Sequence, residues 1–475
     1  MSVKRRQKRV QIKILKLLEN SKWGQRFQIN SKNIETWDNL PLSKASDFGQ
    51  LYPGKVELSF STEKVLHWTP TTGTTGISKW IPLTPTLRKS FTRMFLVWAK
   101  DILRHYPSII FGKCFASVSP SSKDDDLDYI QSWTARIISL FVISSHEIKK
   151  SISAEEFHIC LSKALLKKDL RAISIWSPSY LLNFLNFLKK SDNLAEDDFK
   201  KLWPNLKIIS CWGDGASAAG LQKLKQLFPK TLVQAKGLLA TEGPMTIPLI
   251  DLKGGVPLLD DVYFEFIDSN GRLKKLHELE IDAIYEILPS WLGGFPRYQI
   301  SDLVKVVGFN KAIPLLQFES RKGLTSDLVG EKITEEFAKK TMTQLFSDYV
   351  DNDAQSFLMP LQSEINGKVR YSIVTSASKV ITELEALLLE NPHYALARKQ
   401  GQISFPKVFH VENPQAALLE ASVKAGFGRG DVKPCFLVTN RQIIQQLMIY
   451  FEKEIPGLMP FHQQMAQPIS PELNQ

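Results

Sequence analysis

The sequence predicts an α/β fold with a large N-terminal domain of mixed β-sheets and helices, followed by a smaller C-terminal α+β domain. Three observations support this class. Strand-like and helix-like segments alternate through the first 320 residues, and such alternation favours a largely parallel central sheet. From about residue 260, shorter strand patterns joined by turns take over. A polar stretch at 320–330 then interrupts the pattern, so we place the domains at 1–324 and 325–475.

The N-terminal elements follow from end signals and apolar spacing. Thr84 followed by Pro85 predicts a helix start, and large apolar residues then recur at three- and four-residue steps up to Pro107. Residues 136–145, RIISLFVISS, have the short, β-branched composition of a buried strand. The segments AISIWSPSYLLNFLNFLKK and NLKIISCWGDGASAAGLQKLKQLF each predict a strand, a turn and a helix, and TLVQAKGLLATEG predicts a strand that leads into a polar turn.

Beyond residue 260 the predicted elements are smaller. VYFEFID, AIYEILPS and LVKVVGF are typical of short strands, with a turn signal at 269–271. After SRKGLTSDLVGEKITEEFAKKTMTQLF, whose second half predicts a helix, come the strand RYSIVTS, the helix ITELEALLLE and a closing amphipathic helix at 440–453. The chain of 475 residues is 43% hydrophobic, which is enough to bury sizeable cores in two or three units.

The net charge of +11 depends on one terminus. The first 16 residues, MSVKRRQKRVQIKILK, contain seven Lys or Arg and no acid, and the remainder is nearly balanced. A solvated helix start explains this bias, and an anionic partner is the alternative. A nucleic-acid binder would instead carry its basic stripe on a folded face beside base-reading groups, so we expect no nucleic-acid partner.

Cysteine and histidine spacing gives no support for a structural metal or a disulfide framework. The four cysteines are too far apart for a Cys-x-x-Cys pattern, and no His-x-x-x-His pair occurs. The N-terminus lacks the apolar segment of a signal peptide, and no run approaches the roughly 18 apolar residues of a membrane span. We therefore expect a cytoplasmic protein without a membrane span.

Two glycine-containing turns fail as nucleotide-binding fingerprints. Gly215 and Gly220 have the spacing of a phosphate-binding Walker loop, but Leu221 stands where that loop needs Lys, and no Ser or Thr follows to hold magnesium. This turn can still present backbone groups to a ligand. GFGRGDVK, near residue 426, follows a helical pattern where a dinucleotide fingerprint requires a strand.

The loop within HWTPTTGTTGISKWIPLT, residues 67–84, differs from both turns. Its glycines permit close backbone approach and its threonines supply hydroxyls and amides, which suits the wrapping of phosphate oxygens. The flanking VLHW and KWIPL are strand-like, so a strand-loop-strand element is expected. A β-hairpin loop whose threonines only solvate the turn explains the composition equally well. The candidate phosphate-binding residues are Thr71, Thr72, Gly73, Thr74, Thr75, Gly76 and Lys79.

Six blocks occur in a defined order along the chain: TPTTGTTGISKWIP, WSPSYLL, WGDGAS, VQAKGLLATEG, RYQISDLVKV and SRKGLTSDLVGEKITE. With these blocks the chain resembles the acyl-adenylate-forming (ANL) superfamily and, within it, the auxin and jasmonate acyl-amido synthetase family, in particular its shorter bacterial members. The resemblance spans roughly residues 20–440. It implies a large adenylate-forming domain and a small C-terminal domain that rotates between two half-reactions.

The resemblance also implies a reaction. In the first step a carboxylate attacks the α-phosphate of ATP, with Mg²⁺ present, and expels pyrophosphate. In the second step an amine, expected to be that of an amino acid, attacks the acyl-adenylate and forms an amide. An ATP-dependent ligase of this kind works mainly by positioning its substrates and neutralising phosphate charge.

Individual roles are carried over from the matching motifs. The residues from Thr71 to Gly76, with Lys79, match the phosphate cradle. Thr241 matches a phosphate contact, and Glu242 matches the carboxylate that helps to hold Mg²⁺. The remaining matches are Gly213 and Gly215 beside the adenine and acyl sites, Asp302 on both ribose hydroxyls, Arg321 at the hinge, and Lys433 as the lysine that the small domain delivers to the α-phosphate.

The sequence departs from the family pattern in front of the ribose carboxylate. Gln299 replaces an Arg, Ser301 replaces a Gly, and Ser320 replaces the Gly before the hinge Arg. These changes leave two alternatives open: thioester formation with coenzyme A or an acidic carrier protein that meets the basic N-terminus, and a non-catalytic nucleotide-binding homologue. Four large aromatic residues have two possible roles, the lining of an apolar or aromatic acyl pocket or packing in the core: Trp176, Tyr180, Phe184 and Trp212.

Overall fold

The computed structural model describes residues 2–49, 51–53, 57–71, 79–116, 143, 154–191, 195, 198–329, 331–346, 356–362, 369–377, 381–428 and 432–454. The chain divides into two compact units, Met1–Lys322 and Gly323–Gln475. This division lies two residues from the predicted boundary between 324 and 325. The separate function and motion of each predicted domain stay a prediction.

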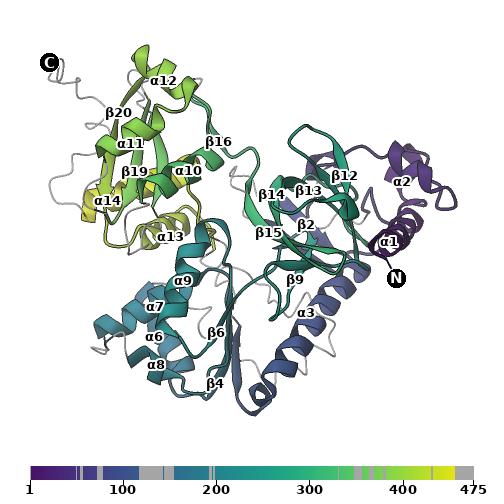
Figure 1. Ribbon diagram of the computed structural model, residues 1–475, viewed down its shortest axis with the longest axis horizontal. Coiled ribbons are helices and arrows are strands. Elements are labelled where there is room, and N and C mark those ends of the chain that lie inside the picture. The colour runs from purple at the N-terminus through teal and green to yellow at the C-terminus, as the bar shows by residue number, and fades with distance from the viewer. Residues whose placement is uncertain are drawn as a thin grey trace. The chain divides into compact units, whose positions relative to one another are not determined.

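A four-stranded parallel sheet lies in the first unit, as the alternation of strands and helices predicts (Figure 1). Its strands, in spatial order, are β3 (Lys113–Ala116), β4 (Leu170–Ser174), β5 (Ile208–Cys211) and β6 (Leu232–Ala235). One face is covered by α6 (Ala154–Leu165), α7 (Pro178–Ser191) and α9 (Ala218–Leu227), with the short α8 (Phe199–Leu202) nearby. The predicted strand at 136–145 lies outside the described residues except for Ile143, whose N–H donates to the Cys114 carbonyl at 2.8 Å.

Helix α3 (Pro85–His105) packs against the other face of this sheet. It begins where predicted, because the Thr84 hydroxyl oxygen accepts a hydrogen bond from the Leu87 N–H at 3.2 Å. Successive strand residues point to opposite faces, so Ile208 packs with Ile102 of α3 while Ile209 packs with α7 and α9. A 3₁₀ turn, η3 (Pro107–Phe111), follows α3.

The second large sheet of this unit is antiparallel and has seven strands. In spatial order they are β12 (Leu273–Lys275), β11 (Val262–Ile267), β13 (Ile284–Trp291), β14 (Asp302–Asn310), β15 (Ile313–Arg321), β10 (Gly255–Pro257) and β9 (Thr246–Pro248). The three predicted strands are confirmed as β11, β13 and β14. The turn predicted at 269–271 follows β11, and Gly271 there has a φ of 77°. Strand β15 was not predicted, because IPLLQFESR lacks regular alternation.

The basic N-terminal segment folds as helix α1 (Val3–Leu18) and packs on β11, with the short α2 (Lys22–Arg26) after it. One face of α1 is apolar and buried, and its Lys and Arg side chains lie mainly on the exposed face. Gln7 is buried, and its side chain accepts from the Phe264 N–H at 2.8 Å and donates to the Val262 carbonyl at 2.9 Å. Arg6 pairs with Asp260 at 2.6 Å. The predicted helix start is confirmed, and the anionic partner stays a prediction.

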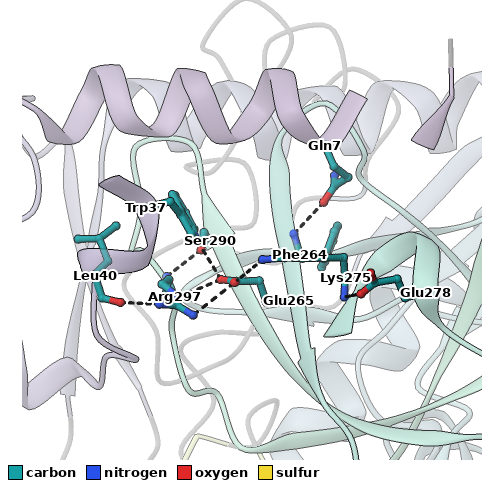
Figure 2. Close-up of polar contacts among 9 residues, drawn as sticks. All are labelled: Gln7, Trp37, Leu40, Phe264, Glu265, Lys275, Glu278, Ser290 and Arg297. Carbon is teal, nitrogen blue, oxygen red and sulfur yellow. Dashed lines mark hydrogen bonds and ion pairs between the residues drawn. The ribbon is translucent and has the colours of Figure 1, made fainter. Parts of the chain in front are cut away.

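A buried ionic network joins the antiparallel sheet to the N-terminal segment (Figure 2). Glu265 of β11 is fully buried, and Arg297 Nε and Lys275 Nζ each lie 3.0 Å from its carboxylate oxygens. Trp37, in the 3₁₀ helix η1 (Ile34–Asn39), donates to the same carboxylate at 3.2 Å. Arg297 also donates to the Leu40 carbonyl. Because removal of one partner would leave a buried charge uncompensated, this network fixes the segment that leads into β14.

The second unit is built on a three-stranded sheet with helices on both faces. Strand β19 (Val369–Thr375) is central, antiparallel to β18 (Phe357–Gln362) and parallel to β20 (Ile403–His410). One face packs on α10 (Glu335–Leu345), α11 (Ile381–Leu388) and α12 (Pro392–Lys399), and the other on α13 (Pro414–Lys424) and α14 (Arg441–Glu454). Two short strands, β16 (Thr325–Ser326) and β17 (Ile333–Thr334), precede α10. The predicted helices and the strand RYSIVTS are confirmed.

Candidate functional site

The threonine- and glycine-rich loop connects two paired strands. Strands β1 (His67–Thr71) and β2 (Lys79–Leu83) are antiparallel, and Thr71 pairs with Lys79. This confirms the strand-loop-strand element. The predicted cradle residues Thr72, Gly73, Thr74, Thr75 and Gly76 lie outside the described residues, and only the backbone is described for Thr71 and Lys79. Their contact with phosphate stays a prediction.

Thr241 and Glu242 form a tight turn between strands β7 (Leu239–Ala240) and β8 (Gly243–Pro244). Gly243 is required at this turn, because a Cβ there would lie 2.5 Å from Trp291 Nε1. The Glu242 carboxylate accepts a hydrogen bond from the Tyr298 hydroxyl at 3.1 Å. Burial raises the pKa of Tyr298 well above its usual value and the negative charge of Glu242 raises it further, so the hydroxyl stays protonated and acts as a donor.

Asp302 and Arg321 face each other across the antiparallel sheet. Asp302 begins β14, Arg321 ends β15, and the two are register partners. Arg321 Nε lies 3.5 Å from Asp302 Oδ1, and the exposed fractions of the two side chains are 38% and 16%. Both charges act on the Tyr298 hydroxyl: Arg321 lowers its pKa and Asp302 raises it. Four side chains therefore gather in one cluster, which we call the carboxylate cluster: Glu242, Tyr298, Asp302 and Arg321.

The turn with Gly213 and Gly215 follows β5 and is tied to β15. A Cβ at Gly213 would lie 2.7 Å from Ala235 Cβ, so the turn can pack here only with Gly. Gly215 has a φ of 56°, in the left-handed region. The Asp214 carboxylate accepts hydrogen bonds from Gln317 Nε2 at 2.8 Å and from the Phe318 N–H at 3.3 Å. The turn is thus attached to the strand that ends at Arg321.

The structure separates the four aromatic residues whose role was left open. Phe184 and Tyr180 of α7 are buried in the core between the helices and the parallel sheet, as core packing predicts. Trp176 and Trp212 are only half-buried, and their ring centroids are 5.8 Å apart.

Lys433 is exposed and lies in the second unit, between α13 and α14.

Comparison with known domains identifies the family. The model of the GH3 family N-terminal domain matches residues 1–198, and that of the GH3 family central domain matches residues 255–321. Together the two matches cover more than half of the chain. The chain belongs to the GH3 family. The central-domain match begins at β10 and ends at Arg321, so it includes both members of the Asp302–Arg321 pair.

Curated members of the GH3 family match the chain over part of their length. Indole-3-acetic acid-amido synthetase GH3.3 of Arabidopsis thaliana is 24% identical over 214 residues, which cover 42% of this chain and 36% of that protein. Jasmonoyl--L-amino acid synthetase GH3.5 of Oryza sativa subsp. japonica is 25% identical over 197 residues, with 34% of each chain covered. The chain spans about a third of the length of the curated relatives it matches.

Solved structures share the fold over nearly the whole chain. AtGH3.15 acyl acid amido synthetase, in complex with 2,4-DB, has a TM-score of 0.74 at 17% identity, covering 94% of this chain and 93% of that one. 2-Hydroxyisobutyryl-CoA ligase in the postadenylation state has a TM-score of 0.55 at 14% identity, covering 95% and 91%. These likenesses confirm the predicted fold class, a mixed α/β fold.

The departures from the GH3 pattern can now be placed. Ser301, where the family has Gly, adopts a φ of 64° in the left-handed region, so the backbone needs here the conformation that Gly adopts most easily. The Ser301 carbonyl accepts from the Lys322 N–H at 2.6 Å. Ser320, the other Gly replacement, is buried in β15. Ser301 thus holds a left-handed backbone conformation that Gly would adopt at lower cost.

Two site residues were missed by the sequence analysis. Tyr298 and Asp214 both stand inside quoted motifs, RYQISDLVKV and WGDGAS, yet neither was assigned a role. Their roles depend on partners far along the chain: Glu242 is 56 residues from Tyr298, and Gln317 is 103 residues from Asp214. The available signal was position: Asp214 stands between Gly213 and Gly215, and Tyr298 stands four residues before Asp302.

Proposed function

We propose that this GH3 protein is an ATP-dependent ligase that adenylates a carboxylic acid and transfers the acyl group to the amine of an amino acid. In the first step a carboxylate oxygen bonds to the α-phosphorus of ATP, and the bond to pyrophosphate breaks. In the second step the amine nitrogen bonds to the acyl carbon and AMP leaves. The observation that carries this proposal is the carboxylate cluster, which brings together residues from three separate segments. The names of the GH3 relatives support the reaction class.

Asp302 is suited to bind the ribose of ATP. An ionised carboxylate is an acceptor with two oxygens and can take one hydrogen bond from each ribose hydroxyl. Arg321, 3.5 Å away, stabilises the charged form and fixes the orientation of the carboxylate. The Gly213–Gly215 turn lies beside the same strand through Asp214, and we assign it to the adenine and acyl sites.

Glu242 is suited to hold Mg²⁺ together with the phosphates of ATP, and Thr241 beside it to contact a phosphate oxygen. Among the described residues no three His, Cys, Asp or Glu side chains come together to hold a metal. A single carboxylate fits Mg²⁺ that arrives with its nucleotide, because Mg²⁺ commonly takes one or two carboxylates plus substrate phosphates. The bound Mg²⁺ would neutralise phosphate charge. Tyr298 keeps the carboxylate of Glu242 in place through its hydrogen bond.

The remaining charges come from the hairpin loop and from the second unit. We assign the backbone of Thr71–Gly76 and the ammonium of Lys79 to the β- and γ-phosphates, and the ammonium of Lys433 to the α-phosphate.

Within the described part of the chain no helix is both long and apolar enough to cross a membrane. All four cysteines are free thiols. Free thiols suit a reducing compartment, so we propose that the reaction takes place in the cytoplasm.

Pyrophosphate exchange tests the first step. Purified protein, Mg²⁺, ATP, labelled pyrophosphate and a panel of carboxylic acids should give acid-dependent incorporation of label into ATP. Glu242→Gln and Lys433→Ala should each lower the exchange rate. Lys399→Ala is the control for Lys433, because Lys399 is an exposed lysine of the same unit, and it should leave the rate unchanged. Chelation of Mg²⁺ should abolish exchange. If no acid supports exchange while ATP still binds, the enzyme assignment fails and the protein is a nucleotide-binding homologue.

The product distinguishes the acceptors. With an active acid, amino acids and thiols are supplied in separate reactions and the products are weighed by mass spectrometry. An amide with an amino acid supports the proposal. A thioester with coenzyme A or with a carrier-protein pantetheine, and no amide, would contradict the second step and leave the adenylation step intact.

A further inference from the structure

A group of polar side chains lies on one face of the sheet in the second unit. Arg370 of β19 stands opposite Leu361 of β18, and Ser372 stands opposite Met359. Residues directly opposite each other in an antiparallel pair lie on the same face of the sheet. Leu361 and Met359 belong to the core that α13 and α14 cover, so Arg370 and Ser372 lie on that face as well (Figure 1).

A shift in the strand register places a second cation beside this pair. The register of β19 and β20 shifts between Arg370 and Ser372, and Lys407 of β20 is the partner of Ser372. Without the shift Pro406 would stand there, so the irregularity works as a β-bulge that re-aims a side chain. Lys407 Nζ lies 5.1 Å from the ring centroid of Phe409, which belongs to the core on the same face.

The guanidinium group of Arg370 lacks a compensating charge among the described residues. Its Nε is buried and has no hydrogen-bond partner, and no described carboxylate forms an ion pair with it. Arginine stays ionised in proteins, and buried charges are normally paired. Burial lowers the pKa of Arg370, and it also lowers the pKa of Lys407, which the charge of Arg370 lowers further. Both cations therefore occupy a place that disfavours positive charge unless an anion compensates it.

Ser372 supplies a second, independent sign of a ligand. Its side chain is 0% exposed, and its hydroxyl has no hydrogen-bond partner within the described part of the chain. Most buried polar atoms in native proteins are hydrogen-bonded, so such a group requires an explanation. Ser372 follows Arg370 by two residues on one strand and faces Lys407 on the next. An oxygen acceptor that reaches both cations would also accept the proton of this hydroxyl.

We propose that Arg370, Ser372 and Lys407 form a binding site for a dianionic phosphoryl group, that of inorganic phosphate or of a phosphomonoester. All three side chains are donors, and phosphate oxygens accept hydrogen bonds from several directions. Two cations balance two negative charges, whereas a carboxylate supplies only one. Arg370 and Lys407 are each half-buried, so their charged groups can be reached from solvent. The site uses none of the residues assigned to ATP, and the inference does not rest on the proposed function.

Occupation of this site would couple the phosphate concentration to the stability of the second unit. A ligand that binds only the folded state stabilises it once the ligand concentration exceeds the dissociation constant. Without ligand, Arg370 and Ser372 each destabilise the fold, because their buried donors lack partners. A phosphoryl site therefore predicts that substitution has opposite effects with and without ligand. Residues that serve only for packing predict the same effect in both conditions.

The test measures thermal unfolding of the full chain at about pH 8, where a phosphomonoester is dianionic because its second pKa is about 6. Phosphate, glycerol 3-phosphate and acetate are titrated separately against sodium chloride of equal ionic strength. Without phosphate, Arg370→Met and Ser372→Ala should melt at or above the wild-type temperature. In saturating phosphate both should melt below it.

Calorimetric titration measures the affinity directly. The dissociation constant for phosphate should rise about tenfold to a hundredfold in Arg370→Met and about threefold to tenfold in Ser372→Ala, because one donor to the anion is lost in each. Lys399→Met is the matched control and should bind as the wild type does. Lys399 is an exposed lysine at the end of α12, which covers the opposite face of the same sheet.

Stabilisation by phosphate that exceeds that by chloride and is lost in Arg370→Met supports the site. A response to glycerol 3-phosphate alone identifies a phosphomonoester as the ligand, and a response to phosphate alone identifies free phosphate. Equal phosphate affinity in the wild type and in Arg370→Met would overturn the site, as would a wild-type melting temperature that follows ionic strength alone. If acetate stabilises as strongly as phosphate, the site binds a carboxylate and the phosphoryl assignment is wrong.

A second pair of variants decides the question if Arg370→Met does not fold. Arg370→Lys keeps the charge but loses the planar fork of donors, and Lys407→Met removes the other cation. Each should weaken phosphate binding about tenfold. Phosphate affinity equal to that of the wild type in both variants would overturn the proposal.

Discussion

Replacement of Tyr298 by Phe isolates one hydrogen bond of the carboxylate cluster. Tyr298 is 4% exposed and its ring stacks on Phe295 with centroids 4.9 Å apart, so the ring should stay in place when the hydroxyl is removed. The Glu242 carboxylate then loses the donor at 3.1 Å. A hydrogen bond to a charged group contributes about 1.5–3 kcal/mol. Glu242 is only half-buried and water replaces part of the interaction, so we expect the lower end, about 1.5 kcal/mol, or roughly tenfold in affinity for Mg-ATP.

Pyrophosphate exchange at saturating acid measures this effect as a tenfold rise in the KM of Mg-ATP, with the acid KM unchanged. Tyr285→Phe is the matched control, because Tyr285 is also 4% exposed and its hydroxyl accepts from a backbone N–H, that of Glu280 at 3.2 Å. Combined with Glu242→Gln, Tyr298→Phe should show a coupling of about 1 kcal/mol in a double-mutant cycle. Unchanged ATP affinity in Tyr298→Phe, or strictly additive energies in the cycle, would refute the assignment of Tyr298 as the residue that positions Glu242.

Three further predictions concern stability and are measured by urea unfolding. Ser301→Gly removes a Cβ from a left-handed backbone, which stabilises the folded state, but it also increases the entropy of the unfolded chain. The free energy of unfolding should therefore change by less than about 1 kcal/mol. Ser301→Val should lower the free energy of unfolding by more than that. Glu331→Ala should destabilise the second unit by about 3 kcal/mol, because this fully buried carboxylate accepts from Tyr371 at 2.6 Å and from two backbone N–H groups. Burial raises the pKa of Tyr371 and Tyr394 well above the usual value. The folded state then keeps protons that the unfolded state loses above about pH 10, so stability should fall as pH rises, by about 1.4 kcal/mol per tyrosine at pH 11. Flat stability of the second unit between pH 9 and pH 11 would contradict this last prediction.

Local signals in the sequence predicted most of the secondary structure. The start of α3 was predictable because Thr84 and Pro85 act within one turn of the chain. Strands β4, β5 and β6 were predictable because each is short and apolar and is followed by a turn signal, whereas β3 was not predicted. Strand β15 was missed because its partners on both sides, β14 and β10, are set by tertiary pairing, and its own residues do not alternate.

The site was predictable only in part for the same reason. The positions of Asp302 and Arg321 come from motif order, but their direct pairing is a consequence of the β14–β15 register, which shifts twice along the two strands. Nothing in the local sequence predicts that the Lys236 ammonium lies beside two indole rings. These rings belong to Trp98 of α3 and to Trp176 after β4, both far from Lys236 along the chain. The alignment of Ser174, Ser210 and Gln234 across the parallel sheet likewise depends on the strand register and cannot be predicted from local sequence.

The end of the first unit limits where a domain rotation can occur. Lys322 follows Arg321 and is held twice: its N–H donates to the Ser301 carbonyl at 2.6 Å, and its Nζ lies 2.7 Å from the buried carboxylate of Glu286. Gly323 comes next, with a φ of 88° and no described atom near the place of a Cβ. A rotation of the second unit, as the family resemblance implies, would therefore change backbone angles from Gly323 onward and leave the Asp302–Arg321 pair intact. The proposed ribose contact should then persist through both half-reactions, while the proposed contact of Lys433, which belongs to the second unit, would change.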